Sequence, residues 1–337
     1  MVLTRSLREQ LGRMESTVNF PPEFGTRFSI SVDTEEEFEW AGPLSRDNHG
    51  VSAVPALREG QSYFAAAGVR PIYFIDTPVL DSDVAVDIFA QIIADDGADV
   101  GVHLHPWVTP PFDEHISRSN SYAGNLPEAI ERAKICHVRD LMVEKLGVCP
   151  IAYRAGRYGI GPNSFRILEE EGFRCDSSIR SLFDYRDDGG PDFRSAHHHP
   201  HVIGPNASMI ELPLTGVYIG RWGDAGRRLF GVVGHVGFMR SALARSGLIE
   251  RIPLTPEGIP ADKACRAIDT ALDIGIRVLT MSFHSPSLAP GYTPYVRDAS
   301  GLRAFYGWFD IVFNHCAKRG ITAASLDAIL KAAALPT

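Results

Sequence analysis

The sequence has few features of small secreted domains or of proteins that bind nucleic acid. Its five cysteines are an odd number, and none forms a CxxC pair. This pattern argues against a disulfide framework and predicts free thiols in a reducing compartment. Acidic residues outnumber basic ones by 41 to 33 without a dense basic stripe, so no nucleic-acid partner is expected. No run approaches the ~20 apolar residues of a membrane span.

The N-terminal residues are polar and charged and contain no apolar signal-peptide core. We therefore expect a cytoplasmic location. The hydrophobic fraction of 45% and charged fraction of 22% are typical of an ordinary globular chain. We interpret residues 1–24 as an N-terminal arm and residues 25–337 as a single domain.

A local pattern of a helix-like stretch, a glycine and an apolar run recurs along the chain. The glycines of this pattern are Gly68, Gly97, Gly147, Gly172, Gly275 and Gly320. Glycine ends helices in the left-handed conformation, and helices alternating with strands imply parallel strands. With two further strands near Phe28 and Met209, about eight βα units predict an α/β fold of the (β/α) barrel type. An open doubly wound sheet is the alternative, but no GxGxxG turn follows the first strand.

Three long segments interrupt this rhythm, at residues 106–127, 184–206 and about 216–260. Long loops in a compact domain are usually functional or disordered, and loops after parallel barrel strands lie on the catalytic face. The second segment contains His197, His198, His199 and His201. We interpret this histidine cluster as a solvated loop or a substrate rim rather than a metal site.

Polar side chains alternate with apolar ones in three of the expected strands. In residues 99–107, His103, His105 and Trp107 share one strand face. Two imidazoles on one face can bind a metal ion together, although a pair of structural interior histidines is the alternative. The same alternation places His284 at the end of a late strand.

Asp33 ends the first strand on its polar face, where a carboxylate can act as a metal ligand or a general base. The acids that follow, Glu35, Glu36, Glu37 and Glu39, are expected to form a solvated loop, with Glu35 kept as a second candidate base. Arg154 ends a fourth strand and can orient a carboxylate or form a structural salt bridge.

Five motifs occur in an order that resembles the polysaccharide deacetylase family, which has the NodB-type catalytic domain, and its exopolysaccharide-related bacterial branch. They are SVDTEEEFEW from Ser31, DVGVHLHPW from Asp99, YRAGRYG from Tyr153, ELPLTG from Glu211 and SFHSPSL from Ser282. The resemblance covers the chain from about Phe28 to its end. It implies a metal-dependent amide hydrolase on a distorted (β/α)7–8 barrel.

By position, the resemblance makes Asp33 the catalytic base, His103 the first metal histidine, Arg154 the residue that orients the base and His284 the general acid. The strand containing Glu211 is a wall of the substrate pocket. The sequence departs from the family at two positions. Thr34 stands where a second, metal-binding aspartate is usual, and Trp107 stands where the second metal histidine is usual.

The leading hypothesis is therefore a hydrolase that removes N-acetyl or related acyl groups from a carbohydrate. Asp33, His103 and His105 hold a divalent ion, with zinc favoured, and His284 donates a proton to the departing amine. Trp107, Tyr158 and Glu211 contact the substrate. One alternative is a metal-free hydrolase of a small cyclic amide, and another is a barrel that binds glycans without cleaving them.

Residues 225–251 are apolar with a basic bias from five arginines. This segment predicts either a helix at a membrane interface or a helix that is buried or contacts a second copy of the chain. The sequence leaves the choice and the oligomeric state open.

Overall fold

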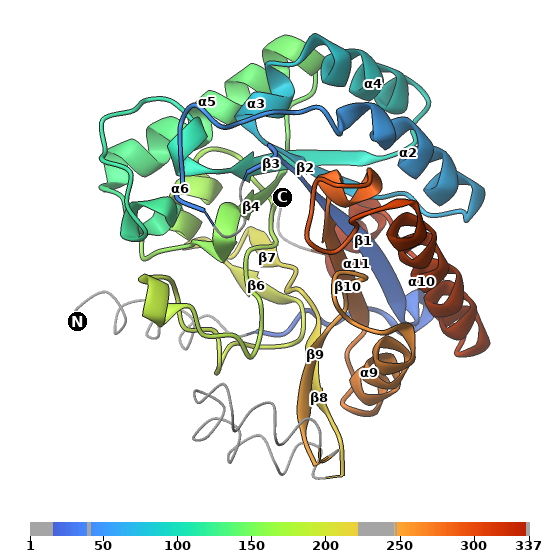
Figure 1. Ribbon diagram of the computed structural model, residues 1–337. Coiled ribbons are helices and arrows are strands. Elements are labelled where there is room, and N and C mark those ends of the chain that lie inside the picture. Colours follow the sequence, from blue (N-terminus) through green and yellow to red (C-terminus); the bar gives the residue numbers. More distant parts are fainter. Residues whose placement is uncertain (1–15, 39–41, 222–245, 247, 335–337) are drawn as a thin grey trace.

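The computed structural model describes residues 16–38, 42–221, 246 and 248–334, and within them the chain forms one main sheet (Figure 1). The strand order is β10-β1-β2-β3-β4-β5-β7-β6, and β11 also pairs with β1. The strands are β1 (Arg27–Thr34), β2 (Ile72–Ile75), β3 (Asp99–Leu104), β4 (Ala152–Ala155), β5 (Cys175–Asp176), β6 (His201–Ile203), β7 (Met209–Glu211), β10 (Val278–His284) and β11 (Thr322–Ala323). All pairs are parallel except the one between β6 and β7.

Helices surround the sheet and cover its outer face (Figure 1). They are α2 (Leu57–Ala66), α3 (Thr77–Leu80), α4 (Asp83–Ala94), α5 (Glu128–Leu146), α6 (Ser164–Glu170), α9 (Ala261–Asp273) and α10 (Ala299–Lys318), whereas a further helix, α11 (Leu326–Ala333), packs on the other face. In α10, Phe305, Phe309, Val312 and Cys316 are buried at helical spacing, as the sequence pattern predicts.

The glycines that separate helices from strands adopt the predicted conformation in five of six cases. Gly68, Gly147, Gly172, Gly275 and Gly320 have φ between 67° and 86°. In the remaining case the left-handed residue is Asp96, with φ of 52°, and not Gly97. The repeated pattern therefore predicts these strand entries correctly, because the left-handed turn is a local property of the chain.

Hydrogen bonds between the two ends of the sheet close it into a barrel. The backbone N–H of Thr215, beyond β7, donates to the carbonyl of Thr280 in β10 at 3.1 Å. Leu254 follows the two-stranded sheet of β8 (Gly216–Ile219) and β9 (Glu250–Pro253), and its carbonyl accepts a bond from Ser282 at 3.1 Å. The prediction of a distorted barrel rather than an open doubly wound sheet is confirmed.

The barrel strands present apolar residues to the helices and a mixed face to the interior. Tyr73 and Ile75 belong to the large core under the helices, whereas Phe74 belongs to a second cluster on the other face of β2. That second cluster also contains Phe20 and Leu330. Residues 16–24 and α11 therefore pack against the interior of the barrel, and polar groups line it toward the carboxyl ends of the strands.

The thiols of all five cysteines are free, as predicted. No helix within the described residues is both long enough and apolar enough to cross a membrane. The candidate interfacial segment at residues 225–251 lies largely outside the described residues.

Candidate active site

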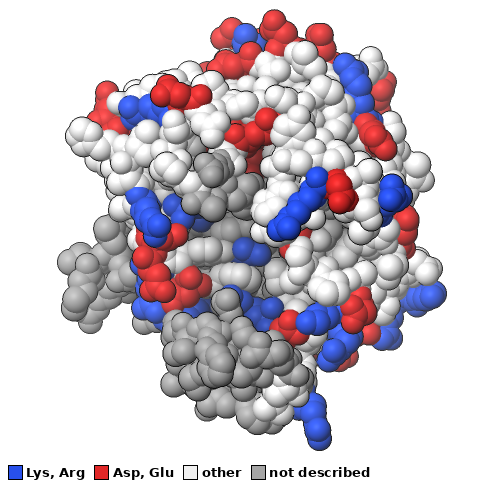
Figure 2. Space-filling model, viewed as in Figure 1, with Lys and Arg blue, Asp and Glu red and all other residues white. Residues whose placement is uncertain are grey.

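A cleft of about 990 Å³ lies where the parallel strands end at their carboxyl termini. Asp33, His103 and His284 from β1, β3 and β10 line its floor. Its rim contains residues of the first two long loops, including Arg118, Tyr122, Tyr185 and Asp188. Figure 2 shows the hollow in the middle of this face, with basic and acidic side chains around it.

Arg154 lies inside the barrel and fixes the position and charge of Asp33. The arginine is fully buried, stacks over the Phe74 ring at 4.4 Å and donates to the Oδ1 atom of Asp33. It also donates to the hydroxyls of Ser31 at 2.9 Å and Ser177 at 2.8 Å. Burial by itself raises the pKa of Asp33, but the adjacent guanidinium together with His103 and His284 outweighs it, and the net shift is downward. Asp33 is therefore a carboxylate at neutral pH.

His103 and His105 are neutral imidazoles whose Nδ1 atoms are already hydrogen-bonded. Burial lowers the pKa of His103 to about 3 and that of His105 to about 4. The Nδ1–H of His103 donates to the carbonyl of Arg154 at 3.1 Å, and that of His105 donates to Oε2 of Glu36 at 2.7 Å. These bonds leave the two Nε2 lone pairs directed into the cleft.

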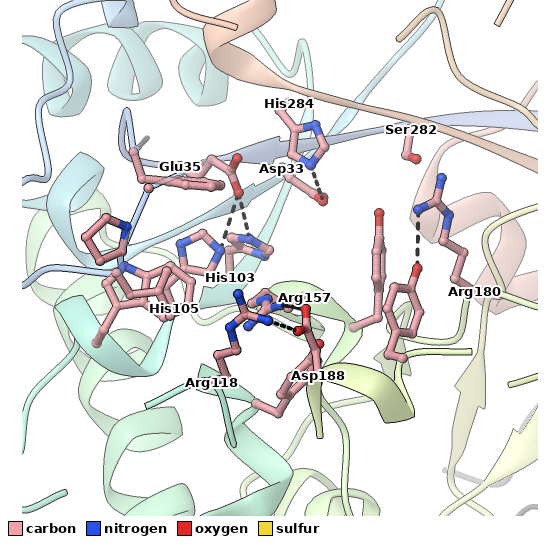
Figure 3. Close-up of a pocket in the computed structure, with 18 of the residues that line it drawn as sticks. Asp33, Glu35, His103, His105, Arg118, Arg157, Arg180, Asp188, Ser282 and His284 are labelled. Atoms are coloured by element: carbon pink, nitrogen blue, oxygen red, sulfur yellow. Dashed lines mark hydrogen bonds and ion pairs between the residues drawn. The ribbon is translucent and has the colours of Figure 1, made fainter. Parts of the chain in front are cut away.

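Both Nε2 atoms face the same oxygen of Glu35 (Figure 3), at 3.3 Å from His103 and 3.4 Å from His105. Glu35 is 4% exposed and Glu36 is fully buried, so the prediction of a solvated acidic loop is wrong for these two residues. Burial and the neighbouring carboxylates raise the pKa of Glu35 well above its ordinary value. Glu37 is partly exposed, and Glu39 lies outside the described residues.

Two of the acids turn inward because the segment after β1 bonds to residues just beyond the ends of β2 and β3. The backbone N–H of Glu36 donates to Oδ2 of Asp76 at 3.0 Å, and Oε1 of Glu36 accepts from the Trp107 indole at 2.9 Å. Trp107 also stacks on His105, with ring centroids 4.2 Å apart. Trp107 therefore holds the histidine and its acceptor in place in addition to lining the cleft.

The ligand atoms of Glu35, His103 and His105 lie within 4.8 Å of one another, as a metal site requires. In addition, the Oε1 atom of Glu35 is buried and has no hydrogen-bond partner among the described residues. Two neutral nitrogens, one carboxylate and an unpartnered buried oxygen fit a divalent ion such as zinc. Asp33 is not a member of this group; its Oδ1 is bound to Arg154.

Glu257 orients His284 on the opposite wall of the cleft. The Nδ1 of His284 lies 2.7 Å from Oε2 of Glu257, and its Nε2 lies 3.9 Å from Oδ2 of Asp33. Burial lowers the pKa of His284, but the carboxylates of Glu257 and Asp33 together outweigh it, and the net shift is upward. Sequence reasoning missed Glu257 because it lies in a loop before α9, where neither periodicity nor a motif marks it.

The expected substrate residues divide between the cleft and the interior. Trp107 and Tyr158 line the cleft, but Glu211 does not. The carboxyl group of Glu211 is fully buried beside Asp176 and accepts from the backbone N–H of Ile179 at 2.9 Å. Its predicted contact with substrate is therefore wrong, because β7 directs this side chain toward β5 and not into the cleft.

The histidine cluster of the second long loop also lies outside the lining of the cleft. His201 belongs to strand β6 and is 3% exposed, whereas His198 binds the carbonyl of Gly216 at 3.0 Å. Among the described residues, these histidines form no group with metal-ligand geometry.

Comparisons with known proteins find similarity of structure without similarity of sequence. No family model matches the chain, and no curated protein matches it in sequence. A protein assigned as a polysaccharide deacetylase from Mycobacterium smegmatis is 18% identical, covers 94% of this chain and 93% of its own, and gives a TM-score of 0.52.

Two further structures match equally broadly. A PuuE allantoinase is 14% identical, with 95% and 94% of the two chains covered and a TM-score of 0.55. A protein assigned as a polysaccharide deacetylase from Pseudomonas aeruginosa PAO1 is 16% identical, with 95% of each chain covered and a TM-score of 0.51. These likenesses show that the chain shares the polysaccharide deacetylase fold.

Proposed function

We propose that this protein is a divalent-metal-dependent hydrolase that removes an acyl group, N-acetyl in the simplest case, from a carbohydrate. The observation that carries the proposal is the group of metal-ligand atoms in the cleft. Two neutral histidines, each with Nδ1 occupied, turn Nε2 toward the buried carboxylate of Glu35. The fold shared with polysaccharide deacetylases supports the same conclusion.

Glu35, His103 and His105 would hold the ion. When bound, a divalent ion polarises a carbonyl oxygen and lowers the pKa of water toward ~7. The revised ligand set replaces Asp33 by Glu35 and leaves Asp33 free for proton transfer. Thr34, which stands where the family usually has a metal-binding aspartate, is buried and donates to the carbonyl of Val32 at 3.3 Å.

Asp33 and His284 would transfer the protons of the reaction. Asp33, kept ionised by Arg154, accepts the proton of the attacking water at Oδ2 while the water oxygen bonds to the acyl carbon. His284, held in its protonated form by Glu257, donates from Nε2 to the amide nitrogen as the carbon–nitrogen bond breaks. The products are a carboxylic acid and the free amine of the sugar.

One observation favours a second candidate, the metal-free hydrolysis of a cyclic amide. The raised pKa of Glu35 allows a proton on its carboxyl group, which could then donate to Nε2 of either histidine without any ion. The structural likeness to an allantoinase fits this alternative. The metal content of the purified protein separates the two candidates.

The test combines metal analysis with an activity assay on protein purified without chelator. We expect about one equivalent of a divalent metal by mass spectrometry, and acetate release from N-acetylglucosamine oligomers that stops with chelator and returns with metal. His284→Ala should keep the metal and lower turnover by about 10²- to 10⁴-fold. Activity that persists in metal-free protein would favour the second candidate. Binding of the sugar without acetate release, whichever metal is added, would indicate a glycan-binding barrel and refute the hydrolase.

A further inference from the structure

Arg180 stands out among the charged residues of the cleft because its contacts are aromatic. It follows β5, lines the cleft beside Tyr158 and is partly buried. Its guanidinium lies 4.0 Å from the ring centroid of Phe183 and 5.2 Å from that of Tyr158, and Nη1 donates to the Tyr185 hydroxyl at 3.2 Å. Within the described part of the chain, no carboxylate forms an ion pair with it.

The other arginines of the site already have carboxylate partners. Arg154 is paired with Asp33, and Arg118 and Arg157 share Asp188 at 2.9 Å and 2.8 Å. These pairs satisfy the guanidinium groups inside the protein. Arg180 therefore contributes a positive charge to the cleft that no acid of the described chain neutralises.

The aromatic groups around Arg180 hold it in place and leave part of its donor capacity unused. Tyr158 and Tyr185 lie with ring centroids 5.4 Å apart, and Phe183 stacks with Tyr185 at 6.2 Å. Rings stabilise a guanidinium through its face, but they accept few of its five N–H bonds. A planar fork fixed by packing is suited to a carboxylate or phosphate, whose oxygens accept two parallel bonds.

Arg180 also lies close to the groups that would perform the reaction. Figure 3 shows Arg180 on the same side of the view as Ser282, with Asp33 and His284 between it and the cluster of Glu35, His103 and His105. Its positive charge acts on His284 and opposes the effect of Glu257 there. Arg180 and His284 both line the same cleft, so a single bound molecule can reach Arg180 and the reaction centre together.

We propose that the substrate carries an anionic group, a carboxylate or a phosphate, and that Arg180 binds it while the acyl amide occupies the floor of the cleft. The proposal rests on the proposed hydrolase function and specifies its substrate class as an acidic acylated sugar. It makes Arg180 the residue that determines specificity between acidic and neutral substrates. Arg118 and Arg157, which form ion pairs with Asp188, stabilise the wall of the cleft.

The test measures binding of sugars that lack an acyl amide, so that turnover is not needed. Glucuronate is compared with its methyl ester, and glucose 6-phosphate with glucose, by titration calorimetry at low ionic strength. For the wild-type protein we expect the matching anion to bind at least about tenfold more tightly than its neutral counterpart, as a charge-assisted hydrogen bond provides. The pair that shows the preference identifies carboxylate or phosphate as the ligand chemistry.

Arg180→Gln should abolish this preference, whereas Arg180→Lys, which keeps the charge, should retain part of it. Arg118→Gln is the matched control, because it removes an arginine from the same rim and should change the preference by less than about threefold. Thermal unfolding followed by circular dichroism checks that each variant is folded. Equal affinities for anion and neutral sugar in the wild type, or an equal loss in both arginine-to-glutamine variants, would overturn the assignment.

The binding test is independent of the proposed activity. An Arg180-dependent preference in a protein that releases no acetate would uphold the anion site and refute the hydrolase. Conversely, hydrolysis of N-acetyl sugars without any preference for acidic sugars would uphold the hydrolase and refute the role of Arg180.

Discussion

Asp33 and His284 occupy paired register positions on β1 and β10, and Oδ2 of the aspartate lies 3.9 Å from Nε2 of the histidine. Each has a partner on its other side that favours its charged form, Arg154 for Asp33 and Glu257 for His284. The two groups that would move protons therefore face one another across the floor of the cleft. Their protonation therefore depends on Arg154 and Glu257, which are not themselves the proposed proton-transfer groups.

Arg154→Gln should destabilise the protein and change the protonation of Asp33. Removing one partner of a buried ion pair leaves an uncompensated charge and costs about 3–5 kcal/mol. In the wild type the lowered pKa of Asp33 contributes stability that is present above its ordinary pKa and is lost as pH falls through the lowered one. The variant should lose this contribution, as urea unfolding between pH 3 and pH 8 would show.

The control for Arg154 is Arg118→Gln, which removes an exposed partner of Asp188. Exposed ion pairs contribute little, so its cost should be below about 1 kcal/mol. If the free energy of unfolding falls equally in both variants, the buried pair of Arg154 and Asp33 stabilises the fold no more than an exposed pair does.

Glu257→Gln should narrow the pH range of activity from the alkaline side. Glu257 raises the pKa of His284, so the protonated imidazole persists to higher pH than an isolated histidine would. Without the carboxylate, the pKa of His284 falls, and the alkaline limb of kcat/KM moves to lower pH. Ser287→Ala, which removes only a hydroxyl that donates to Glu257 at 2.6 Å, should shift this limb much less. An unchanged alkaline limb in Glu257→Gln would exclude His284 as the titrating acid.

The parts of the site that lie on strands could be predicted from sequence. Alternation within β1, β3 and β10 places Asp33, His103 and His284 on the interior face, because side-chain direction in a strand is a local property. Parallel pairing then brings the strand ends together. In the structure His103 pairs with Arg154, just as Asp33 pairs with His284.

The parts that lie beyond the strand ends could not be predicted in this way. Three consecutive acids are usually solvated, and only the approach of β3 makes Glu35 and Glu36 buried partners of two histidines. Glu257 and Arg180 are in loops, where direction depends on tertiary contacts and not on periodicity. The prediction for Glu211 failed for the related reason that β7 places its carboxyl group next to Asp176.

Glu36→Gln should weaken metal binding without removing a ligand. Glu36 accepts the Nδ1–H of His105 and so fixes the tautomer that leaves Nε2 free. Loss of such a carboxylate partner typically lowers metal affinity 10- to 100-fold, which competition with a chelator measures. Glu37→Gln is the sequence-adjacent control, since Glu37 accepts from the backbone of Ala53 and contacts neither histidine. Equal metal affinity in the two variants would contradict the assigned role of Glu36.

Gly156→Ala should disrupt the histidine pair by steric contact alone. A Cβ atom at this position would lie 2.0 Å from Cδ2 of His105 and 2.7 Å from its Nε2, so the ring would have to move. We expect loss of bound metal and of activity. Gly307→Ala in α10 is the matched control, because its Cβ would meet no atom within 4 Å and should stabilise the helix by about 0.5–1 kcal/mol. Retention of metal by Gly156→Ala would show that His105 is not a ligand.

Glu131→Gln should stabilise the protein increasingly as pH rises. Glu131 lies in the first turn of α5, is 1% exposed and has one carboxyl oxygen without a hydrogen-bond partner among the described residues. Burial raises its pKa from an ordinary 4.5 to about 7. The folded state therefore holds this proton more tightly than the unfolded state, and stability is lost as pH rises from 4.5 to 7.

At 1.36 kcal/mol for each pH unit, the loss for Glu131 between pH 4.5 and pH 7 amounts to about 3 kcal/mol. Glutamine keeps an oxygen that can accept from the Ser164 hydroxyl and carries no charge at any pH. The gain in unfolding free energy over the wild type should therefore be about 3 kcal/mol larger at pH 8 than at pH 4.5, as urea titrations would measure. A gain that is equal at both pH values would mean that Glu131 is already ionised in the folded protein at low pH.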